Sequence, residues 1–222
     1  MPTEAEANEA EVTPTDDLRQ GLLDDLAGEL GADLLDAHLV AGDDLWVRVA
    51  TTAWRRAAEV CRSRLGMHYF CFLSAIDWQP SPWGRGEDDP TAPPPERPTE
   101  VVQGVAGGDT RFQVFARVYS VTSKVGLTLK ADVDDAHPAI ETWTGVYAGA
   151  NWHERETWEM FGVEFTGHPA LRNLYLPSDF EGHPLRKDFP LLARMVKPWP
   201  GIVDVEPMPG GDEEETAEGE GA

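Results

Sequence analysis

The chain has 222 residues, 41% of them hydrophobic, and a formal net charge of −22. This length suits one domain with an apolar core, and the charge disfavours nucleic acid as the main partner, because binding a phosphate backbone needs a basic face. The chain has only two cysteines and no secretory signal pattern, which predicts a reducing cytoplasm as its compartment. No apolar run comes near the ~20 residues of a membrane span, which predicts a soluble chain.

Acidic side chains are concentrated at the two ends of the chain. Residues 1–17 hold six acids and no base, and residues 204–222 hold eight acids and no base. Self-repelling segments with few apolar residues are typical of disorder. We therefore expect a disordered acidic leader over residues 1–15 and a disordered acidic tail over residues 204–222.

The first expected element is an amphipathic helix near residues 16–30. Thr15 and Asp16 can cap it, and one face carries leucines at a spacing of four, namely Leu18, Leu22, Leu26 and Leu30. Two short strands, 34–40 and 45–50, should follow around a Gly-Asp turn.

A second helix is expected over residues 50–66, ending at Gly66. Its inward positions are Trp54, Ala57, Ala58, Cys61 and Leu65. Residues 68–78, HYFCFLSAIDW, then predict a buried strand. Between residues 79 and 110 the pattern is lost, and the many prolines there indicate an exposed excursion between two strands.

Order resumes with two strands, 111–120 and 124–133, which are close enough in sequence to pair as a hairpin. The predicted order is helix, two strands, helix, three strands. Because strands and helices do not alternate strictly, this order favours an α+β two-layer domain over residues 16–150 rather than a doubly wound sheet.

Two more helices are expected after the sheet. Residues 138–149 begin with a proline, which is favourable at a helix start. Residues 151–162 should form a helix capped by Asn151 and ended by Gly162. From 163 to 190 we expect irregular or extended backbone, followed by a loosely attached arm over 191–203. Residues 151–203 therefore form a helix plus an extended docking segment.

A Gly-His-Pro triplet occurs twice in this segment, at residues 167–169 and 182–184. The glycine permits a sharp turn, and the residue before a proline is driven toward extended backbone. One hypothesis is a metal site using His153, His168 and His183 with nearby glutamates. The spacing does not favour it, since Thr157 stands where a second helical histidine is needed.

Catalysis and protein docking are the other two hypotheses for residues 151–190. No phosphate-binding loop or nucleophile elbow is present. On a helix, Arg155 and Glu159 are four residues apart and can pair, and such charges can also hold neighbouring loops through bidentate contacts. Extended backbone carrying aromatic and basic residues favours contact with a partner protein.

Residues 154–176, ERETWEMFGVEFTGHPALRNLYL, closely resemble the signature of the C subunit of proton-pumping NADH-quinone oxidoreductase, respiratory complex I. Residues 176–190, LPSDFEGHPLRKDFP, match the usual continuation. Glu159 is one departure, since many members carry aspartate there, and the proline-rich excursion is longer than expected.

The resemblance implies a structural subunit without its own chemistry, on the cytoplasmic side of the cell membrane as a peripheral protein. It implies the D subunit as the chief partner, with the B and I subunits as further neighbours. NADH, FMN, iron–sulfur clusters and quinone are then held by other subunits, and this chain holds no cofactor or metal. The equivalent subunit of a hydrogenase-type membrane complex is an alternative. The implied interface residues are Glu154, Arg155, Glu156, Glu159, His168, Pro169, Arg172, Tyr175, His183, Pro184, Arg186, Lys187 and Asp188.

Overall fold

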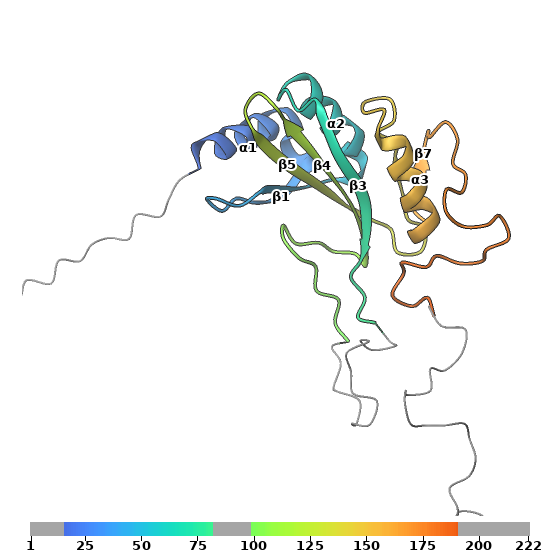
Figure 1. Ribbon diagram of the computed structural model, residues 1–222. Helices are drawn as coiled ribbons and strands as arrows, with labels where there is room; N and C mark the ends of the chain where they lie inside the picture. Colours follow the sequence, from blue (N-terminus) through green and yellow to red (C-terminus); the bar gives the residue numbers. More distant parts are fainter. Residues whose placement is uncertain (1–15, 82–98, 191–222) are drawn as a thin grey trace, which may run out of the picture. The chain divides into compact units, whose positions relative to one another are not determined.

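The computed structural model describes residues 16–81 and 99–190 (Figure 1). In chain order the elements are α1 (Asp17–Leu30), β1 (Leu34–His38), β2 (Leu45–Val49), α2 (Trp54–Ser63), β3 (Tyr69–Asp77), β4 (Phe112–Ser120), β5 (Val125–Val133), β6 (Ala139–Glu141), α3 (Ala150–Phe161) and β7 (Glu164–Thr166). The predicted order from the first helix to the hairpin is confirmed. The predictions for the leader, the arm and the acidic tail lie outside the described residues.

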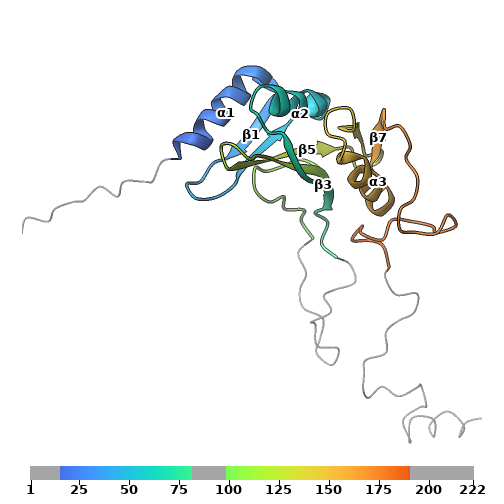
Figure 2. The same ribbon diagram turned by 45° about the horizontal axis from the view of Figure 1, so that its top comes forward.

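Five strands form one sheet in the order β1-β2-β5-β4-β3. The predicted hairpin is confirmed, since β4 and β5 pair antiparallel from Phe112 opposite Val133 to Ser120 opposite Val125. Strands β2 and β5 are parallel, while β1 with β2 and β3 with β4 are antiparallel. This is the α+β, two-layer arrangement expected, with α1 and α2 over one face of the sheet and α3 beside β3 (Figure 2).

Alternate residues of the central strands build the core between sheet and helices. Val114, Ala116 and Val118 of β4 lie next to Ala131, Leu129 and Leu127 of β5, and all six are fully buried. Of the inward positions predicted for the second helix, Trp54, Ala57, Ala58 and Cys61 are buried in α2. Leu65 lies just beyond the last helical residue, Ser63, and is partly buried against the core. Burial in α1 is limited to its second half, at Leu26 and Leu30, so the expectation that Leu18 is inward is wrong: it is 50% exposed.

The helix predicted over residues 138–149 is wrong. This stretch forms β6, which pairs in parallel with β7 through Ile140 and Phe165, and then a turn. The turn is held by tertiary contacts: Trp143 stacks on Trp54 with ring centroids 4.4 Å apart, and the Tyr147 hydroxyl donates to the Met67 carbonyl. Burying two large aromatic side chains in this way outweighs a local helix signal.

The described ends of the excursion between β3 and β4 are only partly exposed. Its middle, residues 82–98, lies outside the described residues. Its last part packs against the sheet face opposite the helices: Ala106 is 8% exposed, the Gln113 side chain donates to the Gly107 carbonyl, and Arg48 pairs with Asp109. The expectation of exposure is therefore wrong near residue 106.

Candidate docking site

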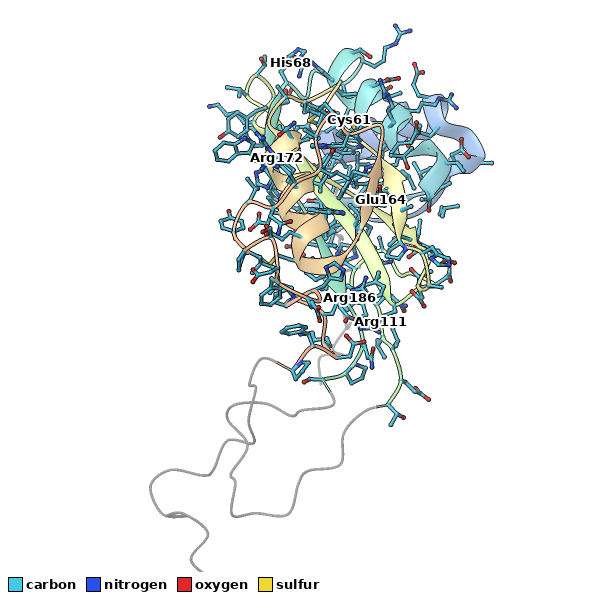
Figure 3. The ribbon with its side chains drawn as sticks, turned by 90° about the vertical axis from the view of Figure 1, so that its right-hand side faces the viewer. Cys61, His68, Arg111, Glu164, Arg172 and Arg186 are labelled. Carbon is cyan, nitrogen blue, oxygen red and sulfur yellow. The ribbon has the colours of Figure 1, made fainter. Side chains whose placement is uncertain are left out.

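The candidate site is the ribbon, defined as residues 167–190. It follows β7 and runs back beside α3 (Figures 1 and 3). Apart from the short strand β7 just before it, the expected irregular backbone is confirmed. Such a segment has no strand ladder, so its N–H and C=O groups bond to side chains, to other backbone groups or to water.

Helix α3 is positioned against β3 and supplies those side chains. It ends at Gly162, as predicted, in a left-handed conformation with φ +74°. The predicted capping role of Asn151 is wrong, because the helix begins one residue earlier, after Gly149, and has no side-chain cap. Its buried face is unusual in carrying charged residues, among them Glu154, Arg155 and Glu159.

Arg155 and Glu159 hold the first half of the ribbon. Arg155 donates to the backbone carbonyls of Arg172 and Asn173, at 3.0 and 3.1 Å. Glu159 accepts from the backbone N–H groups of Leu174, Tyr175 and Leu176, at distances from 2.7 to 3.3 Å. The cation thus binds carbonyls and the anion binds N–H groups. We call this pair the clamp.

The clamp replaces the ion pair that the sequence suggested between its two members. Within the described residues no ion pair joins Arg155 to Glu159, and both side chains reach the ribbon instead. Burial alone would raise the pKa of Glu159, but the N–H groups of the ribbon and the nearby Arg155 outweigh it and hold the pKa below its ordinary value. The prediction that helix charges hold a neighbouring loop is confirmed.

Both Gly-His-Pro triplets form hydrogen-bonded corners. Gly167 and Gly182 have φ of +83° and +94°, which confirms the predicted turns. His168 accepts from the Ala170 N–H at Nδ1, so its Nε2 carries the proton and donates to the Asn151 carbonyl. His183 Nδ1 lies 2.9 Å from the Glu159 carbonyl. Burial lowers the pKa of His168 and favours its neutral form.

The second corner is held by the carboxyl end of α3. Arg186 Nε donates to the Phe161 carbonyl at 2.6 Å, and the Leu185 N–H donates to the Met160 carbonyl. Helix carbonyls in the last turn have no partner within the helix, so the ribbon satisfies them. Sequence reasoning also missed the contact in which the Lys187 N–H donates to the buried Asp77 carboxylate. An acid at the end of an apolar strand was the available signal, since a buried carboxylate needs donors.

Glu154 lies beneath the first corner and does not reach the ribbon backbone. Its side chain is fully buried and accepts from the Trp143 N–H at 2.6 Å and from the Thr142 hydroxyl. The nearest ring nitrogen of His168 is 4.0 Å away. Burial raises the pKa of Glu154 to about 7, and the two hydrogen bonds offset only part of the effect.

The structure divides the predicted interface residues into three sets. Buried are Glu154, Arg155 and Glu159, and the His168 side chain is also fully enclosed. Half-buried are Glu156, His183, Pro184 and Arg186, and exposed are Pro169, Arg172, Tyr175, Lys187 and Asp188. The buried set therefore acts on this chain's own backbone, and the exposed set is available to a partner.

Among residues 16–81 and 99–190 no group of three metal-ligating side chains comes together, and the corner histidines bond to backbone atoms. In the same part of the chain, no helix has both the length and the apolar content to cross a bilayer.

Residues 47–195 match the family model described as the respiratory-chain NADH dehydrogenase, 30 kDa subunit. The chain belongs to this family. The resemblance to the C subunit of complex I is thereby confirmed, and the match includes α3 and the ribbon.

Two relatives show how far the likeness to the 30 kDa family extends. The NADH-quinone oxidoreductase C subunit of Roseiflexus sp. (strain RS-1) is 49% identical over 90 residues, which is 40% of this chain and 52% of the relative. The C/D subunit of Cronobacter sakazakii is 44% identical over 88 residues, 40% of this chain and 15% of the relative. The chain thus spans about half the length of the Roseiflexus relative and much less of the C/D protein.

Two solved structures are also similar. A trypsin-resistant fragment of Nqo5 has a TM-score of 0.48 at 19% identity, covering 69% of this chain and 98% of the fragment. A chain of an archaeal membrane-bound sulfane sulfur reductase has a TM-score of 0.53 at 17% identity, covering 79% of this chain and 88% of its own length. The second likeness shows a shared fold.

Proposed function

We propose that this chain is a structural subunit in the peripheral arm of an NADH-quinone oxidoreductase and binds its neighbours through the outward side of the ribbon. Electron transfer from NADH to quinone and the coupled proton translocation are then carried out by the whole complex. NADH, FMN, iron–sulfur clusters and quinone are held by other subunits.

The observation that carries the proposal is that the ribbon has a bonded backbone but exposed apolar side chains. The backbone groups of residues 172–176 and of Leu185 bond to α3, while apolar side chains remain outside: Tyr175 is 64% exposed, Leu185 51% and Phe180 39%. Trp152 of α3 is 69% exposed. Exposed aromatic and aliphatic residues on an ordered backbone are the usual anchors of a protein interface.

The D subunit is the first partner we propose. Relatives that match this chain at 42–44% identity are named as a C/D subunit, a single chain for both. A fusion keeps the two parts close together, which supports a direct contact between this chain and the D subunit. The B and I subunits are proposed as further neighbours, and the membrane association is proposed to be peripheral, on the cytoplasmic side, through the complex.

The proposal is tested by binding of the full chain to the purified D subunit of the same organism. We expect Tyr175→Ala and Trp152→Ala each to weaken binding at least tenfold, about 1.4 kcal/mol or more, as for an interface anchor. Val121→Ala and Leu35→Ala are matched controls, because these side chains are 68% and 48% exposed but lie on other elements. Equal affinity for both sets of variants would refute docking through the ribbon.

A subunit of a hydrogenase-type or related membrane complex is the second candidate. The likeness to a chain of the sulfane sulfur reductase favours it at the level of fold, whereas the relative at 49% identity, named as part of NADH-quinone oxidoreductase, favours the first. The subunits that copurify with this chain, identified by mass spectrometry, distinguish the two.

A further inference from the structure

The last part of the ribbon is held by residues outside the signature segment. Asp77 is the final residue of β3, and its side chain is fully buried. It accepts from Arg111 Nε at 2.8 Å and Nη2 at 2.6 Å, from the Gln79 N–H at 3.0 Å, and from the Lys187 N–H at 2.8 Å. A carboxylate is stable in a buried site when several donors surround it.

Arg111 extends this contact to the side chains of the ribbon. Its Nη1 lies 3.0 Å from the Asp188 carboxylate. The guanidinium groups of Arg111 and Arg186 both lie against the Phe112 ring, 4.4 and 4.9 Å from its centroid. Figure 3 shows these two arginines next to each other below the end of α3. The two acids, Asp77 and Asp188, offset the like charges.

We call the set Asp77, Arg111, Phe112, Lys187 and Asp188 the latch. It joins positions 110 residues apart in sequence, at the point where β3 leaves the sheet for the excursion and β4 begins. The clamp holds residues 172–176 and the latch holds residues 187–188. Between them lie Phe180 and Leu185, two of the exposed apolar side chains.

We propose that the latch is a positioning device that sets where the second half of the ribbon is presented to the partner protein. This proposal rests on the function proposed above. The clamp fixes the start of this stretch, the bonds of the second corner to the end of α3 fix its middle, and the latch fixes its end. A protein surface with apolar pockets therefore meets Phe180 and Leu185 in one arrangement. Without the latch, the ribbon beyond the second corner loses its attachment to the sheet, and binding has to order it.

The test compares three variants of the full chain, Asp77→Asn, Arg111→Lys and Asp188→Ala. Asp188 has a side chain 48% exposed, so its removal tests the latch without disturbing the core. Arg117→Lys is the matched control: Arg117 also bonds an acid, Asp44, through two nitrogens, and it is 24% exposed where Arg111 is 20% exposed. Lysine keeps the charge but loses the fork geometry.

Two quantities are measured, amide hydrogen exchange in the free chain and affinity for the D subunit. We expect exchange of the Lys187 amide to rise about tenfold or more in the latch variants, with the Leu174 amide, held by the clamp, unchanged. Affinity should fall about tenfold, the effect of roughly 1.4 kcal/mol. The control should change neither quantity.

Unchanged exchange at Lys187 in the latch variants would overturn the proposal. Faster exchange of the Lys187 amide with unchanged affinity for the D subunit would also overturn it, since binding would then not depend on the position of the ribbon end. Tyr175→Ala distinguishes this failure from that of the proposed function: if it weakens binding while the latch variants do not, only the latch is wrong. If neither changes affinity, docking through the ribbon is wrong.

Discussion

The buried carboxyl of Glu154 should make the stability of the fold depend on pH. It has two hydrogen-bond donors, the Thr142 hydroxyl and the Trp143 N–H, but no arginine or lysine pairs with it in the described part of the chain. Burial therefore raises its pKa from the ordinary 4.5 to about 7. A difference of this size corresponds to about 3 kcal/mol of unfolding free energy at 1.36 kcal/mol per pKa unit.

The sign follows from proton linkage. Because the folded-state pKa lies above the unfolded value, the folded chain binds more protons between pH 4.5 and 7. The contribution of Glu154 to stability is then fully present below pH 4.5 and is lost as the pH rises through about 7. His168 acts in the opposite sense, since burial lowers its pKa and its contribution is lost as the pH falls below the ordinary 6.5.

Glu154→Gln isolates the Glu154 contribution. Glutamine keeps the size and an accepting oxygen but does not titrate, so the difference between variant and wild-type stability reports the titration of Glu154. We expect the unfolding free energy of the variant, relative to wild type, to rise by about 3 kcal/mol from pH 4.5 to pH 8. Urea unfolding followed by tryptophan fluorescence measures it, since Trp54 and Trp143 are fully buried.

Glu164→Gln is the control for this series, because it makes the same side-chain change at an exposed position on β7. A Glu154→Gln difference that is independent of pH, or that becomes smaller as the pH rises, would refute the assignment of a protonated buried carboxyl.

Two further predictions concern the clamp and the end of α3. Glu159→Ala leaves three ribbon N–H groups without their acceptor, so hydrogen exchange of the Leu174 and Leu176 amides should rise about 30-fold, equivalent to ~2 kcal/mol of local stability. The control Glu159→Asp keeps the carboxylate and should show a smaller rise. Equal exchange in wild type and Glu159→Ala would contradict the clamp. Gly162→Ala should destabilise the fold by about 1–3 kcal/mol in thermal unfolding, because φ there is +74° and the new Cβ lies 2.5 Å from the His183 ring and 2.6 Å from Arg186. The control Gly28→Ala in α1, where a Cβ meets no atom within 4 Å, should instead stabilise the chain by up to about 1 kcal/mol. A Gly162→Ala variant with the unfolding temperature of the wild type would show that the ribbon does not approach the helix end.

Local sequence pattern was sufficient for elements whose partners are near in sequence or whose periodicity is strong. The hairpin of β4 and β5, the buried face of α2 and the end of α3 at Gly162 all follow from alternation, apolar spacing and glycine. The prediction of a helix over residues 138–149 was wrong because Trp143 and Tyr147 bond to Trp54 and Met67, which are 89 and 80 residues away in sequence. Local propensity carries no information about such contacts.

In the candidate site, too, local features could be predicted from sequence and long-range contacts could not. The Gly-His-Pro corners were predictable, because glycine and proline restrict the backbone directly. The partners of the charges were not. Arg155 and Glu159 have the spacing of a helical ion pair, yet each binds ribbon backbone 15–18 residues further along the chain. Which acceptor a charged side chain reaches depends on tertiary structure that spacing alone does not contain.

This difference changes what the charged signature does. Side chains of alternating charge suggest a surface that meets oppositely charged groups on another protein, but two of the buried ones, Arg155 and Glu159, are bonded to this chain's own peptide groups. An extended segment left in water has to be ordered when it binds, at about 1–2 kcal/mol for each residue fixed. The clamp already holds the backbone of the ribbon in the free chain, so binding a partner does not have to supply this ordering entropy. The affinity can then come from a few outward side chains such as Tyr175 and Leu185.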